Sequence, residues 1–227
     1  MLLSNDYYLN KLYPLQDDVL RAVASCTTDF YLTGGTALGR FFLQHRYSDD
    51  IDFFVNTSNT FREQTEEVLS AFQQHALTAT IIIKTADFIR VQCSKNTVEL
   101  KVDFVNDIPY RFGLPEKFDL FPRVDNWWNI LTNKLTALDR REPKDIADIL
   151  YICRSRSFTW ASALEEGEKK TSYLDPIDLS LVLSEFPIEY LAKVHWVSDI
   201  SFQDAFNDLQ RIAKDIAQKR ENSLSHA

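Results

Sequence analysis

A pair of adjacent glycines in a glycine-poor chain most constrains the fold. The 227-residue sequence has five glycines, and Gly34 and Gly35 stand together. They follow residues 30–32, a short apolar run that predicts a β-strand, and precede residues 36–44, whose apolar positions have helical spacing. Glycine lets the backbone approach a ligand, and a helix start with the hydroxyl of Thr36 suits phosphate. The pattern predicts a phosphate-binding turn, with a plain strand-to-helix turn as the alternative.

Two aspartates mark the next predicted strand, over residues 51–55. Alternate residues of a strand share a face, so Asp50 and Asp52 project together while Ile51 and Phe53 point to the opposite, buried face. Their Cα atoms should lie roughly 6 to 7 Å apart, and like charges held side by side repel unless a cation lies between them. Because a hard divalent ion such as Mg²⁺ prefers carboxylate oxygens, the pair predicts a metal site.

A third carboxylate belongs to the strand predicted over residues 98–105. Its apolar residues form one face, which leaves Glu99, Lys101 and Asp103 on the other. If this strand lies beside the one that bears Asp50 and Asp52, three acids are available for two metal ions. One ion would polarise an attacking hydroxyl and the other would neutralise a triphosphate. The alternative for Asp103 is an acid on the solvated face of an amphipathic strand.

The remaining patterns predict an α+β fold class, with a small mixed β-sheet flanked by helices and an all-α C-terminal region. Further strands are predicted at residues 80–84 and 88–93, and we expect all the strands to form one sheet. Beyond Asn106, prolines interrupt regular structure and helical spacing dominates. We place an α/β core at residues 1–108 and a helical region at residues 109–227. Helices are predicted at residues 15–26, 36–44, 59–75, 126–139, 144–154, 176–185 and 201–220, the last with Ser201 as its N-cap.

Composition limits the class of protein. The formal net charge of −8 argues against binding a polyanion through the field of the whole surface, so any nucleic-acid contact must be focal. Three cysteines without a CxxC pair support neither a disulfide framework nor a zinc site. The sequence has no signal-peptide pattern and no apolar run of about 18 residues, so we expect a cytoplasmic protein without a membrane partner.

Three blocks of the chain carry a family resemblance. The segments GGTALGRFFLQHRYSDDIDFF (34–54), LKVDF (100–104) and NKLTALDRREPKDIADI (133–149) resemble the AbiEii/AbiGii nucleotidyltransferase toxin family of the DNA polymerase β-like nucleotidyltransferase superfamily. The resemblance implies a metal-dependent transfer of a nucleotide from an NTP to an acceptor such as tRNA or another RNA. It implies the toxin of a type IV toxin–antitoxin system, with an antitoxin encoded nearby, and a helical region that completes the nucleotide cleft.

The same resemblance assigns roles to individual residues. It implies that two Mg²⁺ ions, or Mn²⁺ in their place, bind Asp50, Asp52 and Asp103. It implies catalytic roles for these acids and for Lys134 and Asp145. Nucleotide contacts are implied for Gly34, Gly35, Thr36, Arg46, Ser48, Lys134 and Arg140.

The third block leaves one choice between two arginines. Arg141 is as good a match as Arg140 to the family arginine, and on a continuous helix it would share a face with Lys134. Pro143 should start a new helix with Asp145 in its first turn. We expect Lys134 and Asp145 to serve the reaction rather than the fold, with a salt bridge on an exposed helix as the alternative for the lysine.

Several other residues have two interpretations. His45 is a candidate general base, but a structural hydrogen bond that shapes its loop is the preferred hypothesis. Trp127 and Trp128 cannot share one helix face, so we expect one in the core and the other available for base stacking. A basic cluster is either a guide for RNA or triphosphate or a solvated face; it comprises Arg140, Arg141, Lys144, Arg154 and Arg156.

Two other functions fit the same motifs. One is a catalytically weak nucleotide-binding protein that acts through a protein partner and needs no in-line metal geometry. The other is adenylylation of a small molecule such as an antibiotic, because the superfamily uses one kind of metal site for several acceptors. Divalent-dependent labelling of RNA or protein by radiolabelled NTPs distinguishes these functions.

Overall fold

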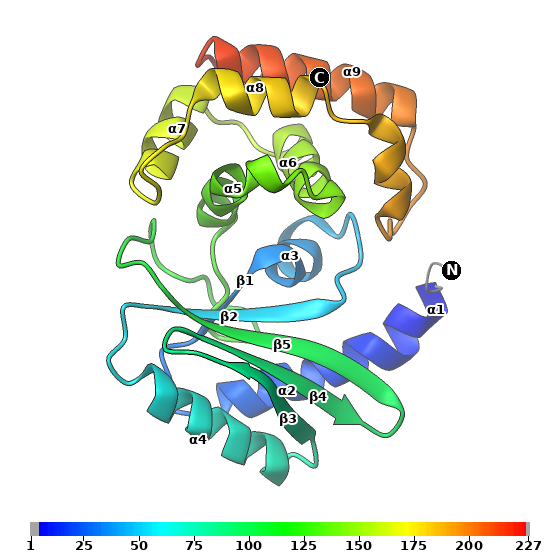
Figure 1. Ribbon diagram of the computed structural model, residues 1–227. Helices are drawn as coiled ribbons and strands as arrows, with labels where there is room; N and C mark the ends of the chain where they lie inside the picture. The colour runs from blue at the N-terminus through cyan, green and yellow to red at the C-terminus, as the bar shows by residue number, and fades with distance from the viewer. Residues whose placement is uncertain (1–4, 226–227) are drawn as a thin grey trace. The chain divides into compact units, whose positions relative to one another are not determined.

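The computed structural model describes residues 5–225, which form two compact units (Figure 1). The sheet unit contains residues 5–41 and 47–126, and the helical unit contains residues 42–46 and 127–225. Within residues 5–225, no helix is both long enough and apolar enough to span a bilayer. The short segment 42–46 therefore packs with the helical unit although it lies between two parts of the sheet unit in sequence.

The sheet unit is built on five strands in the order β1-β2-β5-β4-β3 (Figure 1). Strands β2 and β5 are parallel and the other neighbours are antiparallel, so the sheet is mixed, as predicted. The alternation expected for β2 is present, because Ile51, Phe53 and Val55 are buried. The strands are β1 (Tyr31–Thr33), β2 (Asp50–Asn56), β3 (Thr78–Lys84), β4 (Phe88–Lys95) and β5 (Val98–Asp107).

Helices cover the sheet within this unit. The helices α2 (Tyr13–Ala24) and α4 (Phe61–Gln74) lie on one side, and the short helix α3 (Gly34–Ala37) lies on the other (Figure 1). The chain continues from α3 directly into a π-helical stretch, η2 (Leu38–Leu43), so the predicted helix at residues 36–44 is present but starts at the glycine pair. Two short elements precede α2, namely α1 (Asn5–Tyr7) and η1 (Tyr8–Leu12).

The sheet unit extends further along the chain than the boundary that we placed between residues 108 and 109. The segment after β5 returns to β1, where Leu32 donates a backbone hydrogen bond of 2.8 Å to Arg123 and accepts one of 2.8 Å from Asp125. These bonds satisfy backbone groups at the edge of the sheet. The division between the units consequently falls between Asn126 and Trp127.

The helical unit is all-α in its described residues, as predicted for the C-terminal region. Ser201 is the N-cap of the last helix and accepts a hydrogen bond from the backbone N–H of Asp204, as expected. A helix over residues 160–168 was not predicted, although Trp160, Ala163, Leu164 and Gly167 are buried at helical spacing. The elements are α5 (Trp127–Thr136), η3 (Leu138–Arg140), α6 (Pro143–Ser155), α7 (Trp160–Glu168), α8 (Pro176–Ser184), η4 (Ile188–Lys193) and α9 (Phe202–Ala217).

Candidate active site

Three carboxylates lie on one face of the sheet, as the sequence predicted. Strand β2 pairs with β5 in parallel, and this register puts Asp52 opposite Asp103 and Asp50 opposite Lys101. Asp50 and Asp52 are two residues apart on β2 and so share a face. Like charges directly opposite each other destabilise a sheet. The pair formed by Asp52 and Asp103 is therefore costly unless a cation or a cationic side chain lies close by.

The glycine pair is pressed against this carboxylate face. Gly34 has a φ of +71°, which glycine adopts without the steric cost that other residues meet. A Cβ atom added to Gly34 would lie 2.5 Å from Oδ2 of Asp52, well inside van der Waals contact. The hydroxyl of Thr36 donates a short hydrogen bond to the backbone carbonyl of Asp50. The turn is thus fixed against β2, and the Thr36 hydroxyl bonds the strand rather than pointing into solvent.

Two cationic side chains lie among the carboxylates. Arg90, on β4, donates two hydrogen bonds of 2.8 Å to the two oxygens of Asp103. Lys101 lies with its Nζ atom 2.7 Å from Oδ2 of Asp50 and 4.0 Å from Oδ2 of Asp103. The hydrogen bonds that Arg90 donates to Asp103 raise the pKa of Arg90 above its ordinary value, with further contributions from the charges of Asp103, Asp50 and Asp52. Burial lowers the pKa of Lys101, but Asp50 and the neighbouring acids more than compensate and the net direction is upward. The three carboxylates outnumber the two cationic side chains, so the face keeps a net negative charge.

The carboxylates of Asp50 and Asp52 suit a hard divalent cation, because they share one face of β2 and both residues are half-buried rather than in the core. Ser48 lies beside them, with its Oγ 3.4 Å from Oδ1 of Asp50. Asp103 is different because Arg90 binds both of its oxygens. Over residues 5–225, no three His, Cys, Asp or Glu side chains are grouped so that they could hold one metal ion. The three metal ligands stay a prediction, and Asp103 differs from Asp50 and Asp52 in its bidentate pair with Arg90.

Lys134 occupies the centre of a buried ionic network in the helical unit. Its Nζ atom lies 2.5 Å from Asp145 and 2.8 Å from Asp148. Burial lowers the pKa of Lys134, but the charges of Asp148 and Asp145 more than offset this and the pKa is raised overall. Asp145 lies in the first turn of α6, which Pro143 begins as predicted. Lys134 therefore neutralises two buried acids, so it serves the fold whatever its part in a reaction.

Asp148 is the residue of this network that the sequence did not single out. It is fully buried and accepts two hydrogen bonds from Arg46, of 2.7 and 2.8 Å. Nε2 of His45 lies 2.8 Å from the same carboxylate. Burial acts to raise the pKa of Asp148, yet the charges of Arg46 and Lys134 and the hydrogen bonds hold it well below its usual range. Asp148 thereby anchors residues 42–46 in the helical unit.

His45 and Arg46 are consequently structural in this arrangement. The side chain of His45 is completely buried, and burial lowers its pKa below the ordinary histidine value. Its backbone carbonyl accepts a hydrogen bond of 3.1 Å from Val197. Arg46 is also buried, and it donates hydrogen bonds to both carboxylate oxygens of Asp148. This geometry agrees with the structural hypothesis for His45, and the nucleotide contact assigned to Arg46 stays a prediction.

We expect this network to make stability fall in acid. His45 has a lowered pKa, so the unfolded chain takes up its proton first as pH falls below about 6.5, and stability decreases. Asp148 has a lowered pKa, so its contribution is complete above about pH 4 and is lost below it. Thermal midpoints measured from pH 8 to pH 5 should drop for the wild type, and less for His45→Gln. Parallel curves for the two proteins would show that His45 does not carry this dependence.

The two arginines of the third block differ in the structure. Arg140 lies with Nη2 3.6 Å from Oδ2 of Asp145, whereas Arg141 is 3.8 Å from Glu185 and has a φ of +51°. The helix α5 ends at Thr136, so the expectation that Arg141 shares a helix face with Lys134 is wrong. Arg140 is the arginine that shares an acid with Lys134. The nucleotide contacts assigned to Lys134 and Arg140 and the catalytic roles assigned to Lys134 and Asp145 rest on the family resemblance and stay predictions.

Side chains of the predicted basic cluster and of the tryptophan pair contact other protein side chains. Arg154 binds Asp208 at 2.7 Å, and the Arg156 guanidinium lies 5.5 Å from the centre of the Trp127 ring. Trp127 and Trp128 pack edge to face with their centroids 5.4 Å apart, and both are half-buried. Neither tryptophan is a fully buried core residue, which differs from the expectation of one inside and one outside.

Comparisons with known proteins identify a family and similar folds. The family model described as Nucleotidyl transferase AbiEii toxin, Type IV TA system, matches residues 18–172. The curated protein aq_aa25 of Aquifex aeolicus (strain VF5), described as uncharacterized, is 32% identical over 186 residues, which cover 77% of this chain and 82% of that protein.

Solved structures show the same fold. A putative nucleotidyltransferase from H. pylori has a TM-score of 0.62 at 18% identity and covers 96% of this chain and 97% of its own. JHP933 from Helicobacter pylori has a TM-score of 0.61 at 18% identity, covering 96% and 94%. MenT4, the nucleotidyltransferase toxin Rv2826c from Mycobacterium tuberculosis H37Rv, has a TM-score of 0.59 at 13% identity, covering 94% and 86%.

Proposed function

Because the chain belongs to the AbiEii nucleotidyltransferase toxin family of type IV toxin–antitoxin systems, we propose that it transfers a nucleotide from an NTP to a hydroxyl group of RNA. Membership confirms the predicted family and class of enzyme. The observation that carries the proposal is the β2–β5 register, which puts Asp52 opposite Asp103 with Gly34 in contact with Asp52. That arrangement joins a turn suited to phosphate with a face suited to a divalent ion.

The residues have separate tasks in the proposed reaction. Asp50 and Asp52 would hold Mg²⁺, which when bound supplies Lewis-acid polarisation of phosphate oxygens. Backbone N–H groups of the Gly34–Gly35–Thr36 turn would bind the triphosphate. The acceptor hydroxyl oxygen forms a bond to the α-phosphorus, the bond from that phosphorus to the β-phosphate oxygen breaks, and pyrophosphate leaves with the electron pair. The hydroxyl proton is released to water.

The family also implies a partner. A type IV toxin belongs with an antitoxin, which we propose is encoded next to this chain. The NTP donor and an RNA acceptor such as tRNA place the proposed activity in the cytoplasm. The test is incubation with each labelled NTP, Mg²⁺ and total RNA, followed by separation of RNA from protein. Label in RNA supports the proposal; label only in a small molecule or in no acceptor contradicts it.

Gly34→Ala tests the contact between the turn and the carboxylate face. The added methyl group would meet Oδ2 of Asp52, so the carboxylate must move and transfer should fall by at least about tenfold. Gly113→Ala is the matched control, since Gly113 also has a positive φ (+65°) but its Cβ would meet Asn126. Both variants should lose about 1 kcal/mol of stability from backbone strain. Equal rates of transfer in the two variants would show that the Asp52 contact is unimportant.

A further inference from the structure

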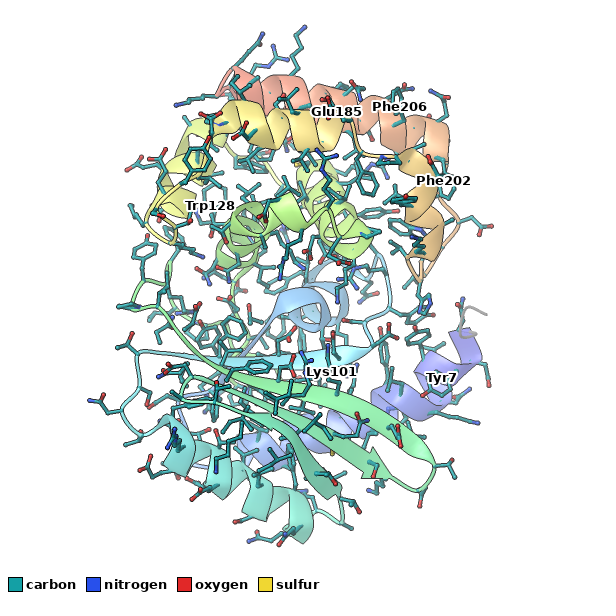
Figure 2. The ribbon with its side chains drawn as sticks, in the orientation of Figure 1. Tyr7, Lys101, Trp128, Glu185, Phe202 and Phe206 are labelled. Atoms are coloured by element: carbon teal, nitrogen blue, oxygen red, sulfur yellow. The ribbon has the colours of Figure 1, made fainter. Side chains whose placement is uncertain are left out.

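Lys101 lies in the place where a cation between two of the carboxylates is expected. Its Nζ atom is 2.7 Å from Asp50 and 4.0 Å from Asp103, so the ammonium group is shared between the two acids. Figure 2 labels this side chain, which comes from β5 next to β2. The lysine is directly opposite Asp50 in the parallel register. Strand pairing therefore fixes the backbone of Lys101 next to Asp50, so their contact does not depend on the side-chain conformation alone.

Arg90 holds the third carboxylate from the other side. Strand β4 pairs with β5 so that Arg90 lies opposite Asp103, and its guanidinium binds both carboxylate oxygens at 2.8 Å. Bidentate arginine–carboxylate pairs are geometrically specific and stronger than single contacts. Asp103 has only 8% of its side chain exposed, so it has little freedom to turn towards another ion. The pairing of β4 with β5 thus gives Asp103 a cationic partner in Arg90.

The formal charges show what these two side chains can replace. Three carboxylates with two divalent ions leave one positive charge to face a triphosphate. Three carboxylates with one divalent ion, one ammonium and one guanidinium leave the same single positive charge. Electrostatic stabilisation of a polyphosphate depends on such a charge held at short range. A second divalent ion in addition to both side chains would add two uncompensated positive charges to the face.

We propose that Lys101 takes the place of the second divalent ion, so that this site binds a single ion through Asp50 and Asp52. The proposal rests on the proposed function and changes the predicted metal count from two to one. Lys101 then faces the phosphates as a fixed positive charge, and Arg90 keeps Asp103 in position. In this arrangement Lys101 neutralises charge on the leaving pyrophosphate.

The test is a titration of the purified full-length chain with Mn²⁺, with free Mn²⁺ measured by electron paramagnetic resonance. The wild type should bind one ion per chain. Lys101→Gln removes the positive charge at nearly constant length, so Mn²⁺ should bind about tenfold more tightly, because the ion no longer faces an ammonium group beside Asp50. Lys101→Arg keeps the charge and should behave as the wild type.

Lys95→Gln is the matched control. Lys95 forms a comparable pair with Asp18 at 2.7 Å and is similarly exposed, 39% against 36% for Lys101, but it does not contact the three acids. Its replacement should leave Mn²⁺ affinity unchanged. Two ions bound by the wild type, or equal affinities in the wild type and Lys101→Gln, would overturn the proposal.

The ion count tests the role of Lys101 and the transfer assay tests the proposed function, so either hypothesis can fail without the other. Two bound ions in a protein that labels RNA would remove the role of Lys101 and leave the proposed function intact. Absence of transfer to any acceptor would remove the proposed function whatever the number of ions bound. Circular dichroism of each variant shows that the fold is retained before affinities are compared.

Discussion

Asp52→Asn is expected to abolish nucleotide transfer while the fold stays intact. Asp52 lies opposite Asp103 and in contact with the Gly34 turn, so it is the carboxylate at which the proposed metal and phosphate sites would meet. Asparagine keeps the shape but loses the charge that a divalent ion needs, and the rate should fall by about three orders of magnitude or more. Stability should stay near that of the wild type, because repulsion between clustered carboxylates decreases.

Asp49→Asn provides the control for this change. Asp49 is exposed and accepts a hydrogen bond of 2.6 Å from the hydroxyl of Tyr8. Asp49→Asn is therefore the same chemical change three residues from Asp52, at a carboxylate with a different partner. Transfer rates with Mg²⁺ should be close to wild type for Asp49→Asn. Full activity in Asp52→Asn would remove the metal site from the account.

The second large effect is on stability rather than on activity. Asp148→Asn should destabilise the protein by about 3–5 kcal/mol, because the largely buried side chains of Arg46 and Lys134 lose a carboxylate that neutralises them. Chemical denaturation measures the change. The control is Asp208→Asn, which breaks the partly exposed pair with Arg154 and should cost about 1 kcal/mol or less. A loss below about 1 kcal/mol for Asp148→Asn would show that the network is dispensable.

The part of the carboxylate face that lies on β2 was predictable because strand alternation is a local consequence of sequence. The period of two that put Asp50 and Asp52 on one face also identified the buried residues of β2. The family resemblance added Asp103, and the register confirmed that its strand lies beside β2. The β-branched runs and the short breaks between them predicted that all the strands form one sheet, whereas the order of the strands comes from the structure alone.

The cationic partners were not predictable in the same way. Which residue lies across from Asp103 depends on the register of β4 on β5, and only the structure shows that Arg90 lies there. Lys101 was assigned to the polar face, but its sharing between two acids required the position of β2. Composition and spacing identify charged residues, whereas their pairing depends on tertiary structure.

Asp148 shows the same limit in the helical unit. Helical spacing favours Lys144, four residues earlier on the same helix, as the partner of Asp148, because such pairs are common on helix surfaces. In the structure Asp148 is fully buried and bound by residues more than a hundred positions earlier in the chain. A signal was present, since Asp148 follows Asp145 by three residues and falls on the buried side of α6.

The most direct test of nucleotide transfer compares two positions of the same label. RNA incubated with the protein and Mg²⁺ receives either an NTP labelled at the α-phosphate or the same NTP labelled at the γ-phosphate. Transfer of a nucleotide requires the α-label in RNA and the γ-label in released pyrophosphate, and both should disappear in Asp52→Asn. Appearance of the γ-label in the acceptor, or equal labelling by wild type and Asp52→Asn, would contradict nucleotide transfer by this site.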